Sequence, residues 1–395
     1  MIFAKQFDQI TKADVDGLVS NQIPEGRELD YKEQLPGTTL EQKRGYLYDL
    51  ASFANTSGGL MIFGIRDQRD PNNNPTGVPV NVLGLSGINA DKEMQWLEQL
   101  QLAGVERRVP GVRFKAIEGF PNGPVILVYI PKSWASPHIV TLGDIHRFYA
   151  RGERGKYLMD WNQIQSAFLF SESIAERIRN FRYDRLAKIE AGQDVPVELE
   201  GNARAVLHIV PISALQPRAS VDIVTLKQNP HRLLPLGFQV RPPGDSNHRL
   251  NLDGFVRSSI GRDTYTLVFR TGAMEAVDTY FLREGRIPFP VFEFEVARST
   301  KAYLSLLTEL GVEPPILVML ALLRVRGLQV FDEHLRKTIG SGFDRDNVLL
   351  PDVLVEELPC DVPKLLKPVF DTMWQAQNKD GSQCYNPDGT FKLGV

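Results

Sequence analysis

Hydrophobic and polar residues follow two different periods in the first third of the chain. Four small or apolar residues recur at helical spacing: Leu47, Leu50, Ala51 and Ala54. This spacing predicts a helix. The helix is expected to end at residues 55–59, because Asn55 and Gly58 belong to the residue types that tolerate positive φ in a helix C-terminus or tight turn. Residues 60–65 are apolar without alternation, which predicts a central strand covered on both faces.

Upstream, residues 28–32 alternate in polarity, which predicts a half-buried strand with Leu29 and Tyr31 turned inward. Asp30 and Lys32 then share the opposite face, because side chains alternate along a strand. Asp67 follows the predicted central strand on a loop. Residues 68–75 are rich in Pro and Asn, which favours an irregular segment.

The remaining pattern predicts further helices and strands in mixed order. Helices are expected at residues 12–20, 90–102, 161–189 and 300–328, and strands at 112–117, 125–130, 145–151, 203–211, 264–270 and 291–297. Residues 191–196 break the long helix and mark a domain boundary. Such an order indicates an α+β protein with an N-terminal mixed sheet, flanking helices and a second α+β domain.

Size and composition narrow the class of protein. A chain of 395 residues is expected to form two domains. Its formal net charge of −3 argues against non-specific coating of nucleic acid but leaves room for a local basic groove. With only Cys360 and Cys384, neither a disulfide framework nor a thiolate zinc site is expected. The early charges at the N-terminus and the short longest apolar run, 316–323, predict a cytoplasmic protein without a membrane span.

Three carboxylates, Glu25, Asp30 and Asp67, form the first candidate site. Among 48 acidic residues, three scattered surface acids are the simple alternative. Their placement before, on and after predicted strands favours convergence. Converging carboxylates repel one another, and Mg²⁺ or Mn²⁺ would offset this repulsion through all-oxygen ligands. Lys32 would either stabilise a pentacovalent phosphate or pair with one of the acids.

A second candidate site is basic. Four cationic residues lie within ten positions, interleaved with Phe148, Tyr149 and Tyr157: Arg147, Arg151, Arg154 and Lys156. This composition suits contact with the backbone and bases of a nucleic acid. The cations between residues 177 and 188 are equally explained by a solvated helix face with charge pairs one turn apart. No GxxxxGK[ST] motif is present, so the sequence gives no support to a P-loop nucleotide site.

Four blocks of residues occur in a characteristic order: Glu25 with Asp30-Tyr31-Lys32, Ala51 to Gly59, Ile62 to Asp67, and Phe148 to Gly152. Together these blocks resemble the Schlafen family and its Alba-like domain, in the bacterial type. The resemblance covers about residues 20–160. It implies residues 1–160 as a Schlafen Alba-like domain and 161–192 as a connecting helix. Residues 193–395 would form an α+β domain of unknown role.

The resemblance also implies a function. In Schlafen ribonucleases an acidic triad cleaves transfer RNA, and its members correspond here to Glu25, Asp30 and Asp67, with Asp30 standing where Glu is usual. Lys32 would assist catalysis, and Mg²⁺ or Mn²⁺ would be the cofactor. The leading hypothesis is a metal-dependent endoribonuclease that prefers structured RNA to DNA and acts in antiphage defence. A non-catalytic DNA- or RNA-binding regulator is the alternative, and ATP binding is a third.

Assembly is the last expectation from the sequence. The animal proteins of the family that this chain resembles pair two Alba-like lobes in one chain to clamp RNA. This chain shows one such lobe, so a homodimer is expected to supply the second. Ile174, Ile178 and Phe181 share one face of the long predicted helix. This face would contact either a second copy or the chain's own domain.

Overall fold

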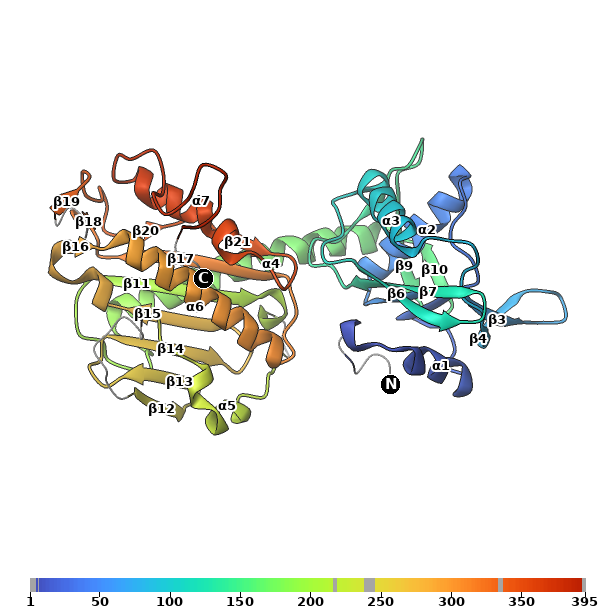
Figure 1. Ribbon diagram of the computed structural model, residues 1–395, viewed down its shortest axis with the longest axis horizontal. Helices are drawn as coiled ribbons and strands as arrows, with labels where there is room; N and C mark the ends of the chain where they lie inside the picture. The colour runs from blue at the N-terminus through green and yellow to red at the C-terminus, as the bar shows by residue number, and fades with distance from the viewer. Residues whose placement is uncertain (1–4, 6, 216–218, 238–245, 333–336, 393–395) are drawn as a thin grey trace. The chain divides into compact units, whose positions relative to one another are not determined.

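The computed structural model describes residues 5, 7–215, 219–237, 246–332 and 337–392. The chain divides into two compact units, residues 1–175 and 176–395, and Figure 1 labels their elements. Both combine helices with several sheets, which confirms the predicted α+β class. No helix among the described residues is long and apolar enough to cross a membrane.

The N-terminal unit contains most of the elements predicted for it. Its helices are α1 (Lys12–Ser20), α2 (Leu40–Ala54) and α3 (Ala90–Gly104), followed by the start of α4 (Trp161–Ala191). Its strands are β1 (Leu29–Lys32), β2 (Gly58–Phe63), β3 (Ile65–Arg69), β4 (Pro75–Val82), β5 (Val105–Glu106), β6 (Arg113–Phe120), β7 (Gly123–Pro131), β8 (Ile139–Val140), β9 (Arg147–Gly152) and β10 (Gly155–Leu158).

Strand β2 is the buried centre of this unit, as its continuous apolar sequence predicted. The main sheet has the order β1-β2-β7-β6, in which β1 runs parallel to β2 and the other pairs are antiparallel. Met61 and Phe63 pack with α2 and α3, whereas Leu60 and Ile62 pack with α1 on the other face. A second sheet, β10-β9-β8-β5, lies against α2.

The chain between Ile65 and Val82 differs from the prediction. Residues 68–75 were expected to be an irregular loop, but β3 and β4 form an antiparallel hairpin, which projects from its unit in Figure 1. Asp67 lies within β3. The Pro and Asn residues occupy the hairpin tip and its edges, where a missing N–H or a positive φ, as at Asn73, is tolerated.

The C-terminal unit is built on one large sheet of order β12-β13-β14-β15-β11-β17-β20, with β21 also paired to β17. Its strands are β11 (Arg204–Pro211), β12 (Ser246–Leu250), β13 (Gly254–Ser259), β14 (Thr264–Phe269), β15 (Met274–Asp278), β16 (Arg286–Ile287), β17 (Ile316–Leu323), β18 (Gln329–Asp332), β19 (Lys337–Ile339), β20 (Val348–Leu349) and β21 (Val353–Val355). Its helices are α5 (Val224–Gln228), α6 (Phe289–Glu309) and α7 (Val362–Gln375).

Two predictions for this unit are wrong. Residues 291–297, expected to be a strand, lie in α6, and residues 316–323, expected to be helical, form β17. An eight-residue apolar run suits a buried strand or a buried helix equally well, so its periodicity does not distinguish them. Pro314 and Pro315 separate the run from α6, because a proline interrupts a helix.

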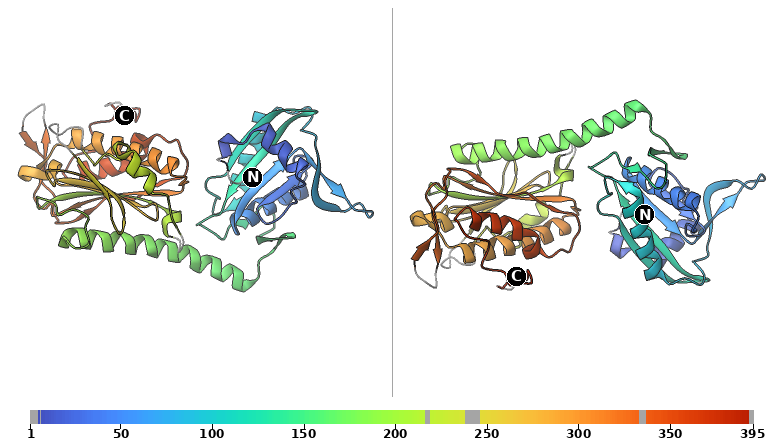
Figure 2. Two further views of the ribbon diagram at one scale, coloured as in Figure 1. Left: turned by 90° about the horizontal axis from the view of Figure 1, so that it is seen from below. Right: turned by 90° about the horizontal axis from the view of Figure 1, so that it is seen from above.

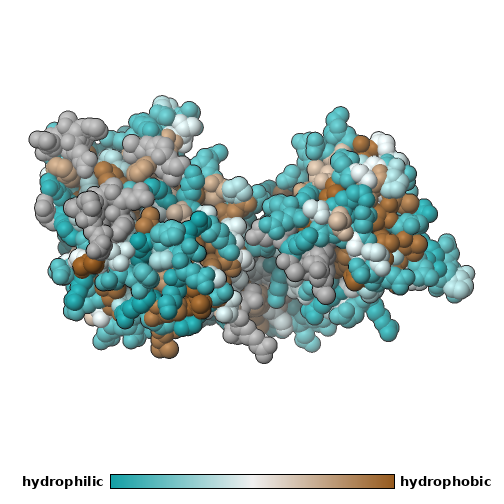
Figure 3. Space-filling model, turned by 60° about the horizontal axis from the view of Figure 1, so that its bottom comes forward, coloured by the Kyte–Doolittle hydropathy of each residue, from teal (hydrophilic) through white to brown (hydrophobic). Residues whose placement is uncertain are grey.

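Helices cover both faces of the large sheet, as Figure 2 shows for α6 and α7 on one face and α4 on the other. Ile178 and Phe181 of α4 pack against the sheet of their own unit, and the Phe181 ring lies 5.4 Å from the His208 ring. The helix face with Ile178 and Phe181, which the sequence predicted as one possible dimer contact, therefore packs within the chain itself. The surface drawn in Figure 3 is mostly hydrophilic, with small separate hydrophobic patches.

Candidate functional site

Strand β1 directs Asp30 and Lys32 toward α2. Asp30 pairs with Met61 and Lys32 with Phe63 in the parallel ladder, and the latter two residues face α2. Leu29 and Tyr31 enter the opposite core, as the alternating sequence predicted. Asp30 is only 3% exposed, however, so the polar face of this strand is buried under the helix.

A network of alternating charges fills this space. Asp30 accepts a hydrogen bond from Arg151 (Oδ1 to Nη2, 2.7 Å) and forms an ion pair with Lys32 (Oδ2 to Nζ, 2.7 Å). Asp49 of α2 lies 2.8 Å from the Nζ of Lys156 and 3.5 Å from both the Nζ of Lys32 and the Nη1 of Arg151. Two aspartates thus hold three cationic side chains beneath and beside α2.

Arg151 is the buried centre of the network. Its side chain is 3% exposed, it donates from Nε to the Gly26 carbonyl (3.1 Å), and its guanidinium lies 4.3 Å from the centroid of the Phe53 ring. A guanidinium enclosed in this way does not reach a phosphate in solvent. We therefore remove Arg151 from the phosphate contacts that the sequence predicted and assign it to the support of Asp30 and Asp49.

Lys32 and Lys156 remain accessible, with 35% and 31% of their side-chain surface exposed. Burial alone would lower the pKa of Lys32, but the charges of Asp49 and Asp30 hold it above its usual value. Burial raises the pKa of Asp30, yet Lys32 and Arg151 outweigh it and keep that pKa below its usual value. The cluster therefore presents two charged ammonium groups to solvent.

Glu25 and Asp67 lie on either side of Gly77 in β4. The Glu25 amide donates to the Gly77 carbonyl at 2.7 Å, and the Gly77 amide lies 3.4 Å from Oδ2 of Asp67. Gly77 has a φ of 74°, and a Cβ there would come within 3.2 Å of Glu25 Oε2. The hairpin thus brings together two acids that the sequence placed 42 positions apart.

Glu25 also contacts β1. Its Oε1 accepts a hydrogen bond from the Tyr31 amide at 2.6 Å, whereas Oε2 has no hydrogen-bond partner among the described residues. Burial, and then the charge of Asp30, raise the pKa of Glu25 to about 7. The hydrogen bond to Tyr31 holds the Glu25 carboxyl beside the residue that stands between Asp30 and Lys32 in β1.

The donor set does not fit the expected cation in this arrangement. Both oxygens of Asp30 already face cationic groups, and Asp67 has Arg69 within 4.0 Å of Oδ1. Within the described ranges no three His, Cys, Asp or Glu side chains are placed to hold a metal ion together. The predicted Mg²⁺ or Mn²⁺ stays a prediction.

The other basic residues occupy the surface beside this cluster. Arg147 begins β9, and Arg154 lies in the turn between β9 and β10. Both are exposed, and Arg154 has no ion pair within the part of the chain that the structure describes. The side chains of Arg147 and Arg154 remain available for the predicted contacts with the phosphate backbone of a nucleic acid.

Asp49 was not among the site residues predicted from the sequence, although its helical spacing indicates a buried position. It follows Tyr46 by three residues and precedes Phe53 by four, so the helical period places its carboxylate on the buried face of α2. An acid at such a position needs a partner, because an unpaired buried charge is strongly unfavourable. This spacing does not indicate which cationic residues pair with the Asp49 carboxylate.

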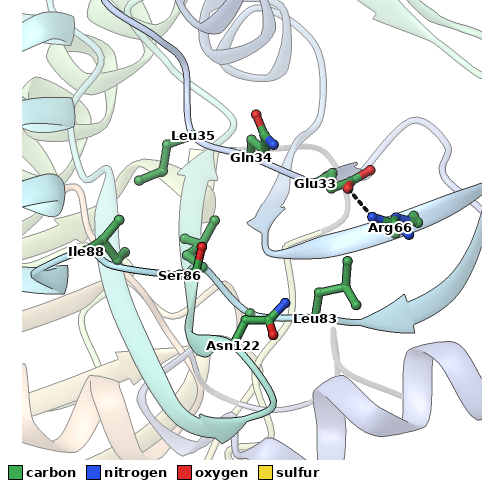
Figure 4. Close-up of a pocket in the computed structure, with 10 residues that line it drawn as sticks. Glu33, Gln34, Leu35, Arg66, Leu83, Ser86, Ile88 and Asn122 are labelled. Atoms are coloured by element: carbon green, nitrogen blue, oxygen red, sulfur yellow. Dashed lines mark hydrogen bonds and ion pairs between the residues drawn. The ribbon is translucent and has the colours of Figure 1, made fainter.

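A cleft of about 360 Å³ lies at the nearby end of the sheet (Figure 4). Leu35, Leu83 and Ile88 line it, and the Arg66–Glu33 ion pair of 2.6 Å lies at its edge. Gly64 connects the cleft with the charged cluster, because its amide donates to the Lys32 carbonyl and its carbonyl accepts from Leu83. Among the described residues, Arg66 is the one cation that lines the cleft, and it is already paired with Glu33, so Lys32 and Lys156 form the better anion site.

Comparisons with known proteins place this cluster in a family domain. The sequence model described as "Schlafen, AlbA_2" matches residues 25–160. No curated protein matches the chain.

Two solved structures show weak similarity. The DIP2311 protein from Corynebacterium diphtheriae shares 21% identity over 38% of this chain and 26% of its own, with a TM-score of 0.25. This chain therefore spans about a quarter of that protein. The N-terminal domain of a putative ATP-dependent DNA helicase RecG-related protein from Nitrosomonas europaea shares 18% identity over 30% of this chain and 70% of its own, with a TM-score of 0.21. Neither similarity is strong enough to support an inference about fold or function.

Proposed function

Because the chain contains a Schlafen AlbA-type domain at residues 25–160, we propose that its N-terminal unit is an endoribonuclease that acts on structured RNA. One observation carries this proposal: Lys32 and Lys156 present partly exposed ammonium groups, and the Glu25 carboxyl is hydrogen-bonded to the amide of Tyr31, the residue before Lys32. Ammonium groups bind phosphate, and a carboxylate beside them is suited to proton transfer.

The proposed roles follow from the contacts of each side chain. Lys32 and Lys156 bind the scissile phosphate and stabilise the negative charge that develops on it. Glu25 accepts the proton of the attacking hydroxyl at Oε2, the oxygen that Tyr31 leaves free. Asp30, Asp49 and Arg151 hold the lysines in place. Asp67, beyond Gly77, helps to orient the backbone around Glu25.

RNA is favoured over DNA because it carries its own nucleophile. The ribose 2′-hydroxyl attacks the adjacent phosphorus and gives its proton to Glu25. The bond from phosphorus to the 5′-oxygen breaks, and the leaving oxygen takes a proton from water. DNA lacks this hydroxyl. Transfer RNA is the substrate, and antiphage defence the setting, that the family resemblance implies.

Cleavage is tested by incubating the full chain with total RNA in Mg²⁺, in Mn²⁺ and in EDTA. Defined fragments are expected, and Glu25→Gln is expected to slow their formation at least about 100-fold. Glu28→Gln is a matched control, because Glu28 is exposed and carries the same charge three residues away. Fragments in EDTA would support the metal-free step, whereas fragments only with Mg²⁺ or Mn²⁺ would support the predicted cation.

A second candidate is a nucleic-acid-binding regulator without cleavage. The pairing of both Asp30 oxygens with Lys32 and Arg151 favours it, since a triad acid would then be occupied. RNA binding by the wild type with no fragments under any of the three conditions would identify this function.

We also propose that the chain forms a homodimer through a contact that does not involve Phe181. Phe181 packs within its own unit and is unavailable to a second copy. Light scattering with and without RNA decides between one chain and two.

A further inference from the structure

Tyr48 forms a half-buried aromatic surface on α2, next to Asp49. Its ring centroid lies 4.2 Å from that of Tyr149, and the two planes are inclined by 31°. Tyr149 is only 8% exposed, so it supports one face of the Tyr48 ring from inside the domain. Nothing in the local sequence pattern connects Tyr48 with the basic segment around Tyr149.

Two arginines flank this pair of rings. Arg44 precedes Tyr48 by one helical turn and is held by a hydrogen bond of 3.0 Å from its Nε to the Leu142 carbonyl. Arg147 precedes Tyr149 by two residues on β9 and is exposed. Arg147 and Tyr149 share one face of β9 because side chains alternate along a strand, so Arg147 lies beside the ring pair. Partial burial, and then Tyr149, raise the pKa of Tyr48.

The ring pair adjoins the proposed phosphate site. The Nζ of Lys156 lies 2.8 Å from Asp49 and 3.3 Å from the Gly45 carbonyl, so it rests on the surface of α2 that carries these two groups. Positive charge therefore runs from Lys32 through Lys156 to Arg44 and Arg147, with Tyr48 beside it.

We propose that Tyr48 is a stacking platform for one unpaired RNA base, with Arg44 and Arg147 holding the phosphates on either side of that base. The assignment rests on the proposed RNA-binding function and specifies which part of the substrate this surface contacts. Proteins recognise unpaired bases by stacking them on aromatic rings, and such stacking tolerates any base. Charge complementarity favours an RNA strand as the occupant, because the flanking side chains are cationic.

The test measures binding of the full chain to a fluorescent 12-nucleotide single-stranded RNA and to a blunt RNA duplex, over a range of salt concentrations. Tyr48→Ala is expected to weaken single-strand binding about 5- to 150-fold and to leave the salt dependence unchanged. Duplex binding is expected to stay the same. Arg147→Ala is expected to reduce the salt slope by about 0.7, because one phosphate contact is lost.

Control variants separate stacking from folding. Tyr48→Phe keeps the ring and is expected to bind like the wild type, whereas Tyr48→Leu keeps apolar packing on Tyr149 and is expected to bind like Tyr48→Ala. Tyr183→Ala removes an exposed tyrosine of the C-terminal unit and should have no effect. Normal single-strand binding by both Tyr48→Ala and Tyr48→Leu would contradict the stacking role of Tyr48 and leave the proposed RNA-binding function standing. Absence of RNA binding by the wild type would overturn the proposed function together with the platform.

Discussion

Arg151 shows how one residue changes its role between sequence and fold. It stands in a basic segment, yet its guanidinium is buried between Asp30 and Asp49 and packs on Phe53. The charge of a buried arginine is compensated by its carboxylate partners, and the removal of one partner leaves the other charges unbalanced. Arg151 is therefore a support of the site, and Lys32 and Lys156 are its accessible cations.

Arg151→Met is expected to lower the free energy of unfolding of the N-terminal unit by about 3–5 kcal/mol, because the variant leaves two buried carboxylates without their shared cation. Urea denaturation followed by circular dichroism measures this loss. Arg154→Met is the matched control, since Arg154 is exposed and should change stability by less than about 0.5 kcal/mol. Equal stability of the two variants would contradict the buried network.

Glu293 is a second residue whose surroundings set a measurable property. It lies inside the C-terminal unit, where it accepts hydrogen bonds from Trp374 and from the Ser382 hydroxyl. Burial raises its pKa from 4.5 to about 7, although these hydrogen bonds act in the opposite direction. In the folded chain the carboxyl therefore keeps its proton at pH values where the unfolded chain has lost it.

This difference predicts a pH-dependent stability. Between about pH 4.5 and pH 7, unfolding releases the Glu293 proton, so stability falls as the pH rises, by about 2–3 kcal/mol in all. Glu293→Gln imitates the protonated side chain and is expected to remove this fall. Urea midpoints from pH 4.5 to pH 8 test it, with exposed Glu356→Gln as the control. Glu25 of the N-terminal unit also has a raised pKa, so the slope is read from the transition of the C-terminal unit. A slope of that transition that persists in Glu293→Gln would contradict the assignment.

At the scale of elements, the end of α2 is joined to the strand that carries Arg151. Asn55 donates from Nδ2 to the carbonyls of Tyr149 (2.9 Å) and His138 (3.0 Å), and its Oδ1 accepts from the His138 amide (2.7 Å). One amide thus satisfies three backbone groups of a neighbouring sheet. A positive φ of 73° at Gly58 then starts β2, where a Cβ would lie 2.5 Å from the Lys132 amide.

Asn55→Ala is expected to destabilise the N-terminal unit by about 2–4 kcal/mol, because backbone groups that are largely shielded from water lose their partners. The loss should also release β9 from α2, so the Arg151 amide is expected to exchange its hydrogen faster. Hydrogen exchange and urea denaturation measure both effects. Asn81→Ala, at an exposed position of β4, should leave both unchanged.

At the scale of the whole molecule, each unit has its own hydrophobic clusters. The clusters around β2 contain only residues of the N-terminal unit, and those on the large sheet contain only residues from 178 onward. The C-terminal half of α4 is fixed to the large sheet by the buried Arg185–Glu275 pair, with His208 also bonded to Glu275. The stability of each unit therefore depends on different residues.

Phe181→Glu and Arg151→Met are expected to act on different thermal transitions. Phe181→Glu places a charge between α4 and the large sheet and should lower the transition of the C-terminal unit, whereas Arg151→Met should lower that of the N-terminal unit. Differential scanning calorimetry of the full chain resolves the two effects. Identical shifts of one common transition in both variants would contradict separate cores.

The sequence by itself determined the elements whose patterns are local. The alternation of 28–32 predicted β1, the helical spacing before Asn55 predicted α2, and the apolar run after Gly58 predicted the buried β2. It also identified Glu25, Asp30 and Asp67 as the acids to examine. It predicted β17 wrongly, because a short apolar run has no period that separates a buried strand from a buried helix.

Only the tertiary structure decided which charges meet. Asp30 and Arg151 are separated by 121 positions, and nothing in the local pattern of either segment indicates that their side chains form a pair. The pairing arises because β9 packs across α2. Asn55, at the C-terminus of α2, also donates a hydrogen bond to the Tyr149 carbonyl of β9. The same packing encloses Asp49, leaves Lys32 and Lys156 accessible, and places Tyr48 on Tyr149. Local periodicity predicts which face of an element is buried, whereas the partner across that face depends on how distant segments pack.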